Sequence, residues 1–115
     1  MPRSERETSG RQTAALFSAL AHPLRREILM VLNFRGGSMS AGEIAARFAC
    51  RWPTTTRHLR VLQQTSLVRV EKRGRRRIYQ LNVSVLHQLL GQWLSWFPQK
   101  PKGSQRKRAT YYNPG

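Results

Sequence analysis

Two helix starts that lie close together constrain the fold of this chain more than any other feature of its sequence. Ser40 and Glu43 have the spacing of a capping box, in which each side chain accepts a hydrogen bond from the other residue's backbone amide. The helix that begins there is expected to end near Phe48. Proline favours the first helical turn, so Pro53 predicts a second helix that reaches about Gln64. Two short helices joined by a few residues are typical of a helix-turn-helix.

The residues after this pair predict a hairpin and a last helix. Residues 67–70 and 78–81 have strand composition and flank a turn at Gly74. Asn82 is placed to cap a helix over residues 83–97. Apolar spacing predicts two earlier helices, over residues 12–21 and from Pro23 to the glycines at 36 and 37. The predicted fold class is mainly α with a β-hairpin wing, a winged helix-turn-helix in the order α-α-α-α-β-β-α.

The length of 115 residues fits one domain. Residues 1–10 are expected to form a flexible N-terminal arm, and residues 11–97 the winged helix-turn-helix domain. Residues 98–115 carry five Lys or Arg, no acid, three Pro and two Gly. That composition predicts a basic, disordered tail.

The charge of the chain indicates the kind of partner. Lys and Arg number 21 against five Glu and no Asp, a formal net charge of +16. A charge that large repels itself and destabilises a compact chain. We therefore expect a polyanion, and nucleic acid in particular, as the usual partner. On composition alone, a ribosomal or generally adhesive basic protein is the alternative.

Three features of the sequence predict a cytoplasmic protein. No apolar run approaches the roughly 18 residues that a membrane span needs, so no membrane association is expected. The polar N-terminal segment, which carries two Glu, does not have the pattern of a secretory signal. The single Cys50 excludes an internal disulfide and fits a reducing compartment.

Several runs of residues, in the same order, resemble the ArsR/SmtB-type bacterial repressors. Residues 20–29 resemble the second-helix signature of that family. Residues 57–62, and then 67–68 and 74–81, are similar to its recognition helix and wing. The resemblance extends over residues 12–97. It implies a dimeric winged-helix repressor that a metal, thiol chemistry or another signal releases from DNA.

The chain departs from that family at the positions that usually carry the signal. Residues 40–48 lack the paired cysteines of metal-sensing members, and residues 83–97 offer only His87 as a ligand. Three further departures are His22 for Asp, Arg51 for an N-cap Ser, and Ser66 for Gly. Ser66 is therefore expected in a left-handed conformation, which costs on the order of 1 kcal/mol. The resemblance implies the fold and DNA binding but no inducer.

The helix that starts at Pro53 is the expected recognition helix, because Leu59 and Leu62 form its inner face. Its outward residues should meet base edges and phosphates of double-stranded DNA. Arg57 is expected to pair with guanine and Arg60 to contact phosphate, while Thr55 packs inside. The alternative is a solvated face on which arginines touch only phosphate. The predicted reading residues are Trp52, Thr54, Thr56, Arg57 and Arg60.

The hairpin is the expected second contact with DNA. Residues 69–77 hold six cations and one acid, Glu71, a poor surface unless an anion lies opposite. Contact with phosphates or the minor groove follows. Arg77 shares a strand face with Tyr79 and Leu81, so we expect it at the base of the wing. The predicted wing residues are Lys72, Arg73, Arg75 and Arg76.

The last helix has more apolar residues than one buried stripe requires, which indicates a second surface. We expect the first helix to join it in a homodimer interface, where aromatic residues are favoured. The alternative for some of these residues is the core of a single chain. The predicted interface residues are Leu16, Phe17, Leu20, Leu86, Leu89, Leu90, Trp93, Trp96 and Phe97.

Cys50 lies in the predicted turn before the recognition helix, where the ArsR-type family usually has an apolar residue. A small buried hydrophobe is therefore the expected role. The alternative is a redox-sensing thiol, activated by Arg47 and Arg51. The three histidines, His22, His58 and His87, lie in different elements without ligand spacing, so no metal and no cofactor is expected.

The sequence therefore predicts a sequence-specific regulator that binds double-stranded DNA as a homodimeric repressor. No paired carboxylates, Cys–His motif or phosphate-cradling glycine loop indicates an enzyme. Two alternatives stay open. One is a basic architectural or RNA-binding protein that binds without sequence preference. The other is a regulator that acts mainly through a protein partner on its apolar last helix.

Overall fold

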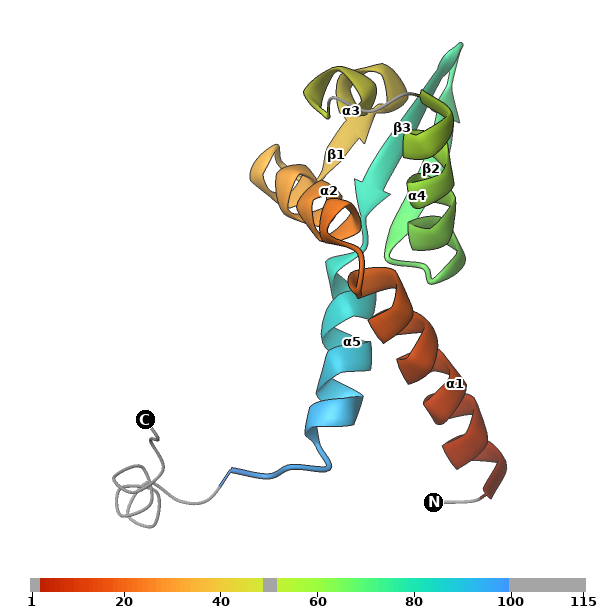
Figure 1. The fold of residues 1–115 in the computed structure, drawn as a ribbon, viewed down its shortest axis with the longest axis vertical. Coiled ribbons are helices and arrows are strands. Elements are labelled where there is room, and N and C mark those ends of the chain that lie inside the picture. Colours follow the sequence, from red (N-terminus) through yellow and green to blue (C-terminus); the bar gives the residue numbers. More distant parts are fainter. Residues whose placement is uncertain (1–2, 49–51, 100–115) are drawn as a thin grey trace.

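The computed structural model describes residues 3–48 and 52–99 of the chain. In Figure 1, the middle helices and a small sheet form a compact half, from which the first and the last helix extend. This architecture confirms the predicted winged helix-turn-helix, with the hairpin of β2 and β3 as the wing. The elements are α1 (Arg3–Leu20), α2 (Pro23–Phe34), β1 (Ser38–Ser40), α3 (Ala41–Arg47), α4 (Trp52–Gln64), β2 (Val68–Arg73), β3 (Arg76–Leu81) and α5 (Val83–Leu94).

Strand β1 is the element that the sequence did not predict. It pairs antiparallel with β3, so that Met39 lies opposite Tyr79 and the sheet order is β1-β3-β2. Both of these side chains are buried. Three residues are too few for a two-residue alternation to be recognised in a sequence. The strand fixes the start of α3 on the sheet, because its last residue, Ser40, is also the N-cap of that helix.

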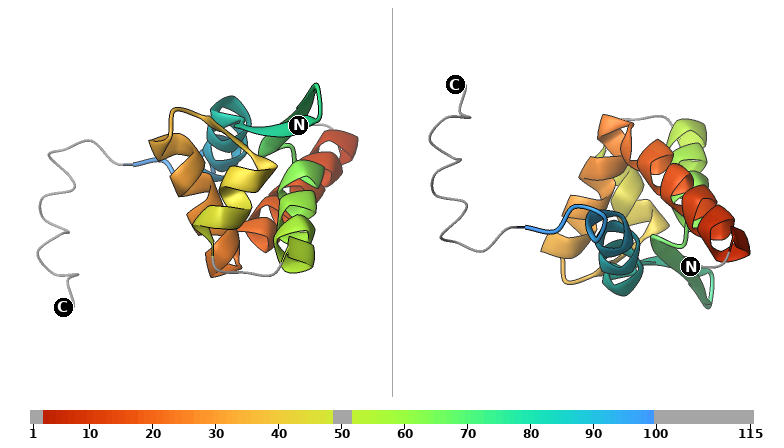
Figure 2. Two further views of the ribbon diagram at one scale, coloured as in Figure 1. Left: turned by 90° about the horizontal axis from the view of Figure 1, so that it is seen from above. Right: turned by 90° about the horizontal axis from the view of Figure 1, so that it is seen from below.

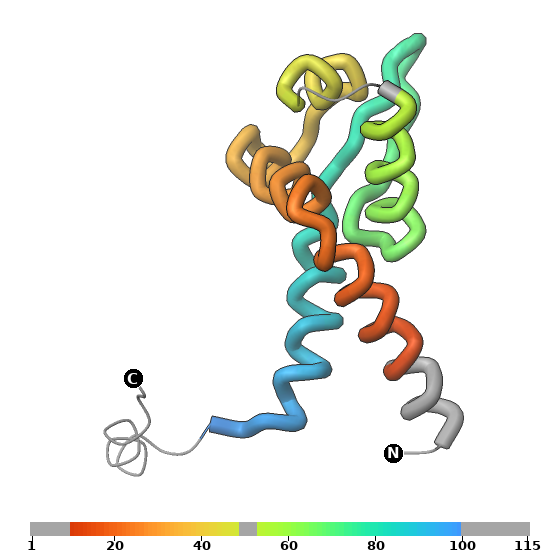
Figure 3. The backbone as a smooth tube through the Cα atoms, in the orientation of Figure 1, coloured from red at the N-terminus to blue at the C-terminus, as the bar shows by residue number. Residues whose placement is uncertain are grey.

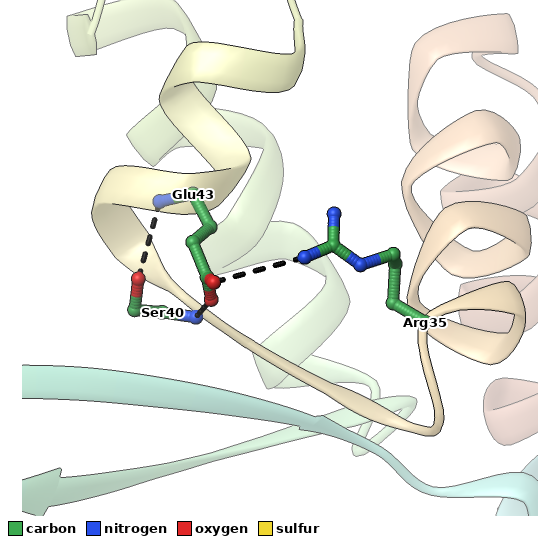
Figure 4. Close-up of polar contacts among 3 residues, drawn as sticks. All are labelled: Arg35, Ser40 and Glu43. Carbon is green, nitrogen blue, oxygen red and sulfur yellow. Dashed lines mark hydrogen bonds and ion pairs between the residues drawn. The ribbon is translucent and has the colours of Figure 1, made fainter.

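The capping box at the start of α3 is confirmed (Figure 4). The Glu43 backbone N–H donates to the Ser40 hydroxyl at 3.1 Å, and the Ser40 backbone N–H donates to the Glu43 carboxylate at 2.8 Å. The guanidinium of Arg35 lies 3.8 Å from the second carboxylate oxygen. The backbone hydrogen bond from Ser40 is the main cause that lowers the pKa of Glu43. The cap therefore depends on an ionised carboxylate.

The end of α4 confirms the expected left-handed residue. Ser66 has φ 64°, the one positive φ outside glycine in the described ranges. The Leu67 backbone N–H donates to the Leu62 carbonyl at 3.0 Å, which closes the helix end and turns the chain into β2. Glycine usually fills such a position because it has no Cβ. Serine there retains strain on the order of 1 kcal/mol.

The ends of the two outer helices differ from expectation. α1 begins at Arg3, so the first helix starts earlier than residue 12, where we expected it, and includes residues 3–10. Once a helix is nucleated, each further residue adds a hydrogen bond, and Arg and Glu are good helix formers. α5 ends at Leu94, short of residue 97, and the Asn82 side chain makes no cap hydrogen bond.

The core lies in the compact half and extends between α1 and α5. It joins inward residues of every helix to the sheet, and the fully buried members include Leu16, Ile28, Leu32, Ile44, Leu59, Leu62 and Leu67. The backbone trace in Figure 3 shows α1 and α5 extending from the compact half at one end of the molecule, and both lie in front in the view from below (Figure 2, right). No helix in the described ranges is both long and apolar enough to cross a membrane.

Candidate nucleic-acid interface

Helix α4, the predicted recognition helix, presents two arginines on its outer side. It packs against α2 and β2 (Figure 1), and Leu59, Leu62 and Thr55 are buried on its inner side, as predicted. Arg57 and Arg60 are exposed and lie three residues apart, so they share one outward stripe. The fold therefore leaves both guanidinium groups accessible to a ligand.

The threonines of α4 are less exposed than its two outer arginines. Thr54 and Thr56 are half-buried. The hydroxyl oxygen of Thr56 is buried without a hydrogen-bond partner among the described residues. A buried, unpaired hydroxyl costs about 1–3 kcal/mol. The side chain of Trp52, a further predicted reading residue, lies outside what the structure describes.

The wing places like charges directly opposite one another. In the register of β2 and β3, Lys72 lies opposite Arg77 and Arg73 opposite Arg76, and all four side chains are exposed. Like charges at opposed positions destabilise a hairpin. Gly74, with φ 63°, allows the tight loop that leads to Arg75. The strands therefore hold these cations in an arrangement that an anion would stabilise.

Glu71 partly neutralises one side of the wing. Its carboxylate accepts from the Arg73 guanidinium at 3.0 Å and from the Gln80 amide at 3.3 Å. Arg73 therefore has an anionic partner within the chain. Among the predicted wing residues, Lys72, Arg75 and Arg76 have no such ion pair in the described ranges.

A cleft separates the wing from α3. It has a volume of about 810 Å³, and its walls are the first residues of α3 and Arg75, Arg76 and Arg77. Arg77 was expected at the base of the wing, whereas it is exposed and lines this cleft. The reason is the register, which puts Arg77 only one pair from the end of the ladder, while Tyr79 is buried below it.

One contact between α2 and α4 was not predicted from the sequence. His58 on α4 is buried, and its Nδ1 lies 3.4 Å from the guanidinium of Arg25 on α2. Burial is the main cause that lowers the pKa of His58, and His22, Arg25 and Arg57 lower it further. The two partners are 33 residues apart. Nothing in the local spacing of either residue indicates the contact.

The predicted interface residues of α1 and α5 divide into two groups. Leu16 and Leu89 are buried within this chain, which corrects their assignment to a subunit interface. Leu16 and Ala19 share the inner side of α1, so the next residue, Phe17, points outward. Leu20, Leu86 and Leu90 are half-buried against the core. Phe17, Trp93, Trp96 and Phe97 are exposed, as is Leu94, which was not predicted.

Three of the exposed rings pack together across the two helices. Trp93 on α5 meets Phe17 on α1 edge to face at 5.0 Å between ring centroids, and its other neighbour is Phe97, also at 5.0 Å. The exposed fractions are 38% for Phe17, 40% for Trp93 and 59% for Phe97. Large apolar groups left in solvent in one contiguous patch mark an interaction surface. We name this patch, with Leu94 and Trp96, the aromatic face.

Part of what was predicted about thiol and metal sensing concerns residues that the structure does not describe. Cys50 lies outside the described residues. Among the described residues, no three His, Cys, Asp or Glu side chains come close enough to hold a metal ion. His22 and His58 are close, with ring centroids 4.3 Å apart, although the sequence placed them in separate elements.

The fold and this surface define a DNA-binding protein of the winged helix-turn-helix class. The helix-turn-helix domain family matches residues 20–71. The chain is 35% identical over 85 residues to the transcriptional repressor SdpR of Bacillus subtilis (strain 168), a match that covers 74% of this chain and 91% of SdpR.

Two further comparisons give the same result. The arsenical resistance operon repressor of Staphylococcus xylosus is 31% identical over 74 residues, which are 64% of this chain and 69% of that repressor. The solved structure of an ArsR-like transcriptional regulator from Rhodococcus sp. RHA1 superimposes with a TM-score of 0.67 at 27% identity and covers 90% of each chain. The chain belongs to the ArsR-type helix-turn-helix repressors, which are sequence-specific DNA-binding transcriptional regulators.

Proposed function

We propose that the chain represses transcription as a homodimer that occupies operator DNA. In each subunit, α4 lies in the major groove and the wing contacts the adjacent backbone or minor groove. The observation that carries this proposal is the set of opposed wing cations beside the exposed arginines of α4. Two strands that hold Lys72 against Arg77 and Arg73 against Arg76 are stabilised when a polyanion lies against them.

The parts of the surface take different roles. Arg57, on the outer stripe of α4, pairs with guanine through its two parallel donors. Arg60 and the wing residues Lys72, Arg75 and Arg76 contact phosphates, which fix the register but carry no sequence information. Because Arg73 is paired with Glu71, its contribution is smaller than that of its neighbours.

The aromatic face supports the homodimer. An exposed patch of Phe17, Trp93, Leu94, Trp96 and Phe97 is costly in water, and a second copy related by a two-fold axis would cover it with the same residues. The same axis would give the two α4 helices the symmetry of a palindromic operator. We further propose that the protein acts in the cytoplasm, is not an enzyme and needs no metal.

Selection of binding sites from a pool of random duplexes tests the proposal. The affinity for the selected duplex and for a scrambled one is then compared by fluorescence anisotropy at one salt concentration. A specific regulator should prefer its site by about 10³-fold or more. A ratio near one would favour an architectural protein that binds any sequence. Weak binding to every duplex would favour a regulator that works through a protein partner.

A further inference from the structure

Arg25 connects three helices through one guanidinium group. Its Nε donates to the Ala19 carbonyl at 2.8 Å, and its Nη2 donates to the Ser18 carbonyl at 3.2 Å, both at the C-terminal end of α1. Its Nη1 lies 3.4 Å from Nδ1 of His58 on α4. Arg25 itself belongs to the first turn of α2. The guanidinium makes the three contacts from three different nitrogens in one fixed plane, whereas a lysine ammonium carries all its donors on a single nitrogen.

The two histidines at this junction both use Nδ1 as an acceptor. Arginine has no acceptor atom, so Nδ1 of His58 must accept the proton that Arg25 donates. Nδ1 of His22 accepts from the Leu24 backbone N–H at 3.2 Å and so caps α2. The two rings lie 4.3 Å apart between centroids, tilted by 53°. The contact with Arg25 requires a neutral His58 imidazole, because protonation of Nδ1 removes the acceptor.

The charged groups that act on His58 are all potential cations. They are His22 at the turn before α2, Arg25 on α2, and Arg57 on α4 itself. Burial is the main cause that lowers the pKa of His58, and these three groups lower it further. The imidazole is therefore held neutral at physiological pH, when the contact with Arg25 is intact.

We propose that Arg25 and His58 form a positioning pair that sets the angle of α4 against α1, and that protonation of His58 releases α4. The proposal rests on the proposed function, in which α1 belongs to the dimer interface and α4 reads DNA. Two reading helices must be spaced about one helical turn of DNA apart. Loss of the link between α1 and α4 therefore disturbs operator recognition, while contacts to phosphates survive.

The direction in which operator affinity changes with pH distinguishes the positioning pair from general electrostatic attraction. Acid makes the protein more cationic, and a polyanion binds a more cationic protein more tightly. General electrostatics therefore predicts that affinity for every duplex rises as the pH falls. The positioning pair predicts instead that operator affinity falls, relative to a scrambled duplex, as His58 gains a proton. The ratio of the two affinities isolates the effect, because it cancels the electrostatic part.

The test measures the operator-to-scrambled affinity ratio of the full chain between pH 7.5 and 5.5. In the wild type the ratio should fall, by up to about tenfold per pH unit for each histidine that must lose its proton. His58→Asn keeps an acceptor near Nδ1 but does not titrate, so its ratio should stay constant. Arg25→Lys should lower the ratio at every pH. The matched control is Arg26→Lys, because within residues 3–48 and 52–99 the side chain of Arg26 donates to the Leu20 carbonyl alone, at 2.6 Å, and the variant should behave as the wild type.

Two results would overturn the positioning pair. One is a wild-type ratio that stays constant or rises in acid, and the other is a His58→Asn profile that falls in parallel with the wild type. Scrambled-duplex affinity and helicity by circular dichroism, measured at each pH, show that every variant is folded. If His58→Asn fails to fold, the titration of the wild-type His58 ring, followed by NMR with and without operator, decides the matter: operator binding must lower its pKa further. A wild type without operator preference at pH 7.5 would refute the proposed function instead.

Discussion

The compact half of the molecule and the α1–α5 end leave different kinds of group unpaired. On α4 and the wing, exposed cations face one another across the hairpin ladder, with Glu71 as the one acid among them. On α1 and α5, the large exposed apolar side chains include those of the aromatic face, and none of the five residues of that face is charged. Each surface is costly in water for its own reason, charge repulsion in one case and apolar exposure in the other.

The difference indicates two different partners. A cationic surface is stabilised by a polyanion, and its binding must weaken in salt because phosphates release counterions. An apolar surface is stabilised by another apolar surface, and salt has little effect on that contact. The two halves should therefore respond to different perturbations, and salt and a charge in the aromatic face test them separately.

The largest expected effect is that of salt on DNA binding by the cationic half, that is, by α4 and the wing. If the wing and α4 of a dimer neutralise roughly 6–10 phosphates, DNA affinity falls by about 10³-fold or more between 50 and 200 mM salt. Fluorescence anisotropy with one duplex measures this, and the dimer mass by light scattering serves as the control, which should not change. An affinity that hardly depends on salt would contradict the role of the cationic half.

The next largest effect is expected from a charge placed in the aromatic face. Trp93→Glu places a charge between Phe17 and Phe97, where it has no partner in a closed interface. The wild type should have about twice the monomer mass, and the variant should be monomeric or unfolded. Loss of the tethered second half-site should lower operator affinity by about 10²-fold. The matched control, Met30→Glu, changes an exposed apolar residue on α2 and should remain dimeric; a monomeric wild type that binds operator tightly would refute the interface.

Smaller effects should distinguish, on α4 and the wing, the residue that contacts bases from the residues that contact phosphates. Arg57→Ala should cost about 1–3 kcal/mol at the operator and relax the preference at one or two base positions. The double variant Arg75→Ala with Arg76→Ala should weaken all duplexes about equally. Site selection repeated with each variant measures both effects. An unchanged preference in Arg57→Ala would show that α4 is not the reading helix.

The smallest effect concerns strain at the end of α4. Ser66→Gly should stabilise the free protein by up to about 1 kcal/mol, since glycine adopts a positive φ without the Cβ penalty. Urea denaturation followed by circular dichroism measures the free energy of unfolding. Ser95→Gly is the control, because Ser95 at the end of α5 has φ −64° and gains nothing from glycine. A gain in the control as large as at Ser66 would argue against strain.

Local chemistry explains which parts of the fold could be predicted. The left-handed Ser66 was expected from the resemblance to the ArsR-type family. The capping box of Ser40 and Glu43 and the buried Leu59 of α4 depend instead on neighbours within a few residues. Such patterns are visible in a sequence. The exposure of Arg57 and Arg60 follows from the same helical period. The outer side of α4 could therefore be predicted together with its buried inner side.

Contacts between distant segments explain what could not be predicted. The pair of Arg25 and His58 depends on how α2 crosses α4, and β1 exists only because β3 lies beside it. On α1, neighbouring apolar residues gave no sign of which one faces the core. The fold buries Leu16 and leaves Phe17 for the aromatic face. The functional role of each exposed residue stays a prediction.

Hydroxyl-radical footprinting on the DNA that flanks the protein's own gene tests most directly whether two subunits read one operator. A two-fold dimer with one α4 in each major groove should protect two half-sites whose centres lie about 10 bp, or a multiple of that, apart. Their sequences should be related by inverted repetition. A single protected half-site, or uniform protection without a boundary, would contradict a dimer that reads DNA with α4.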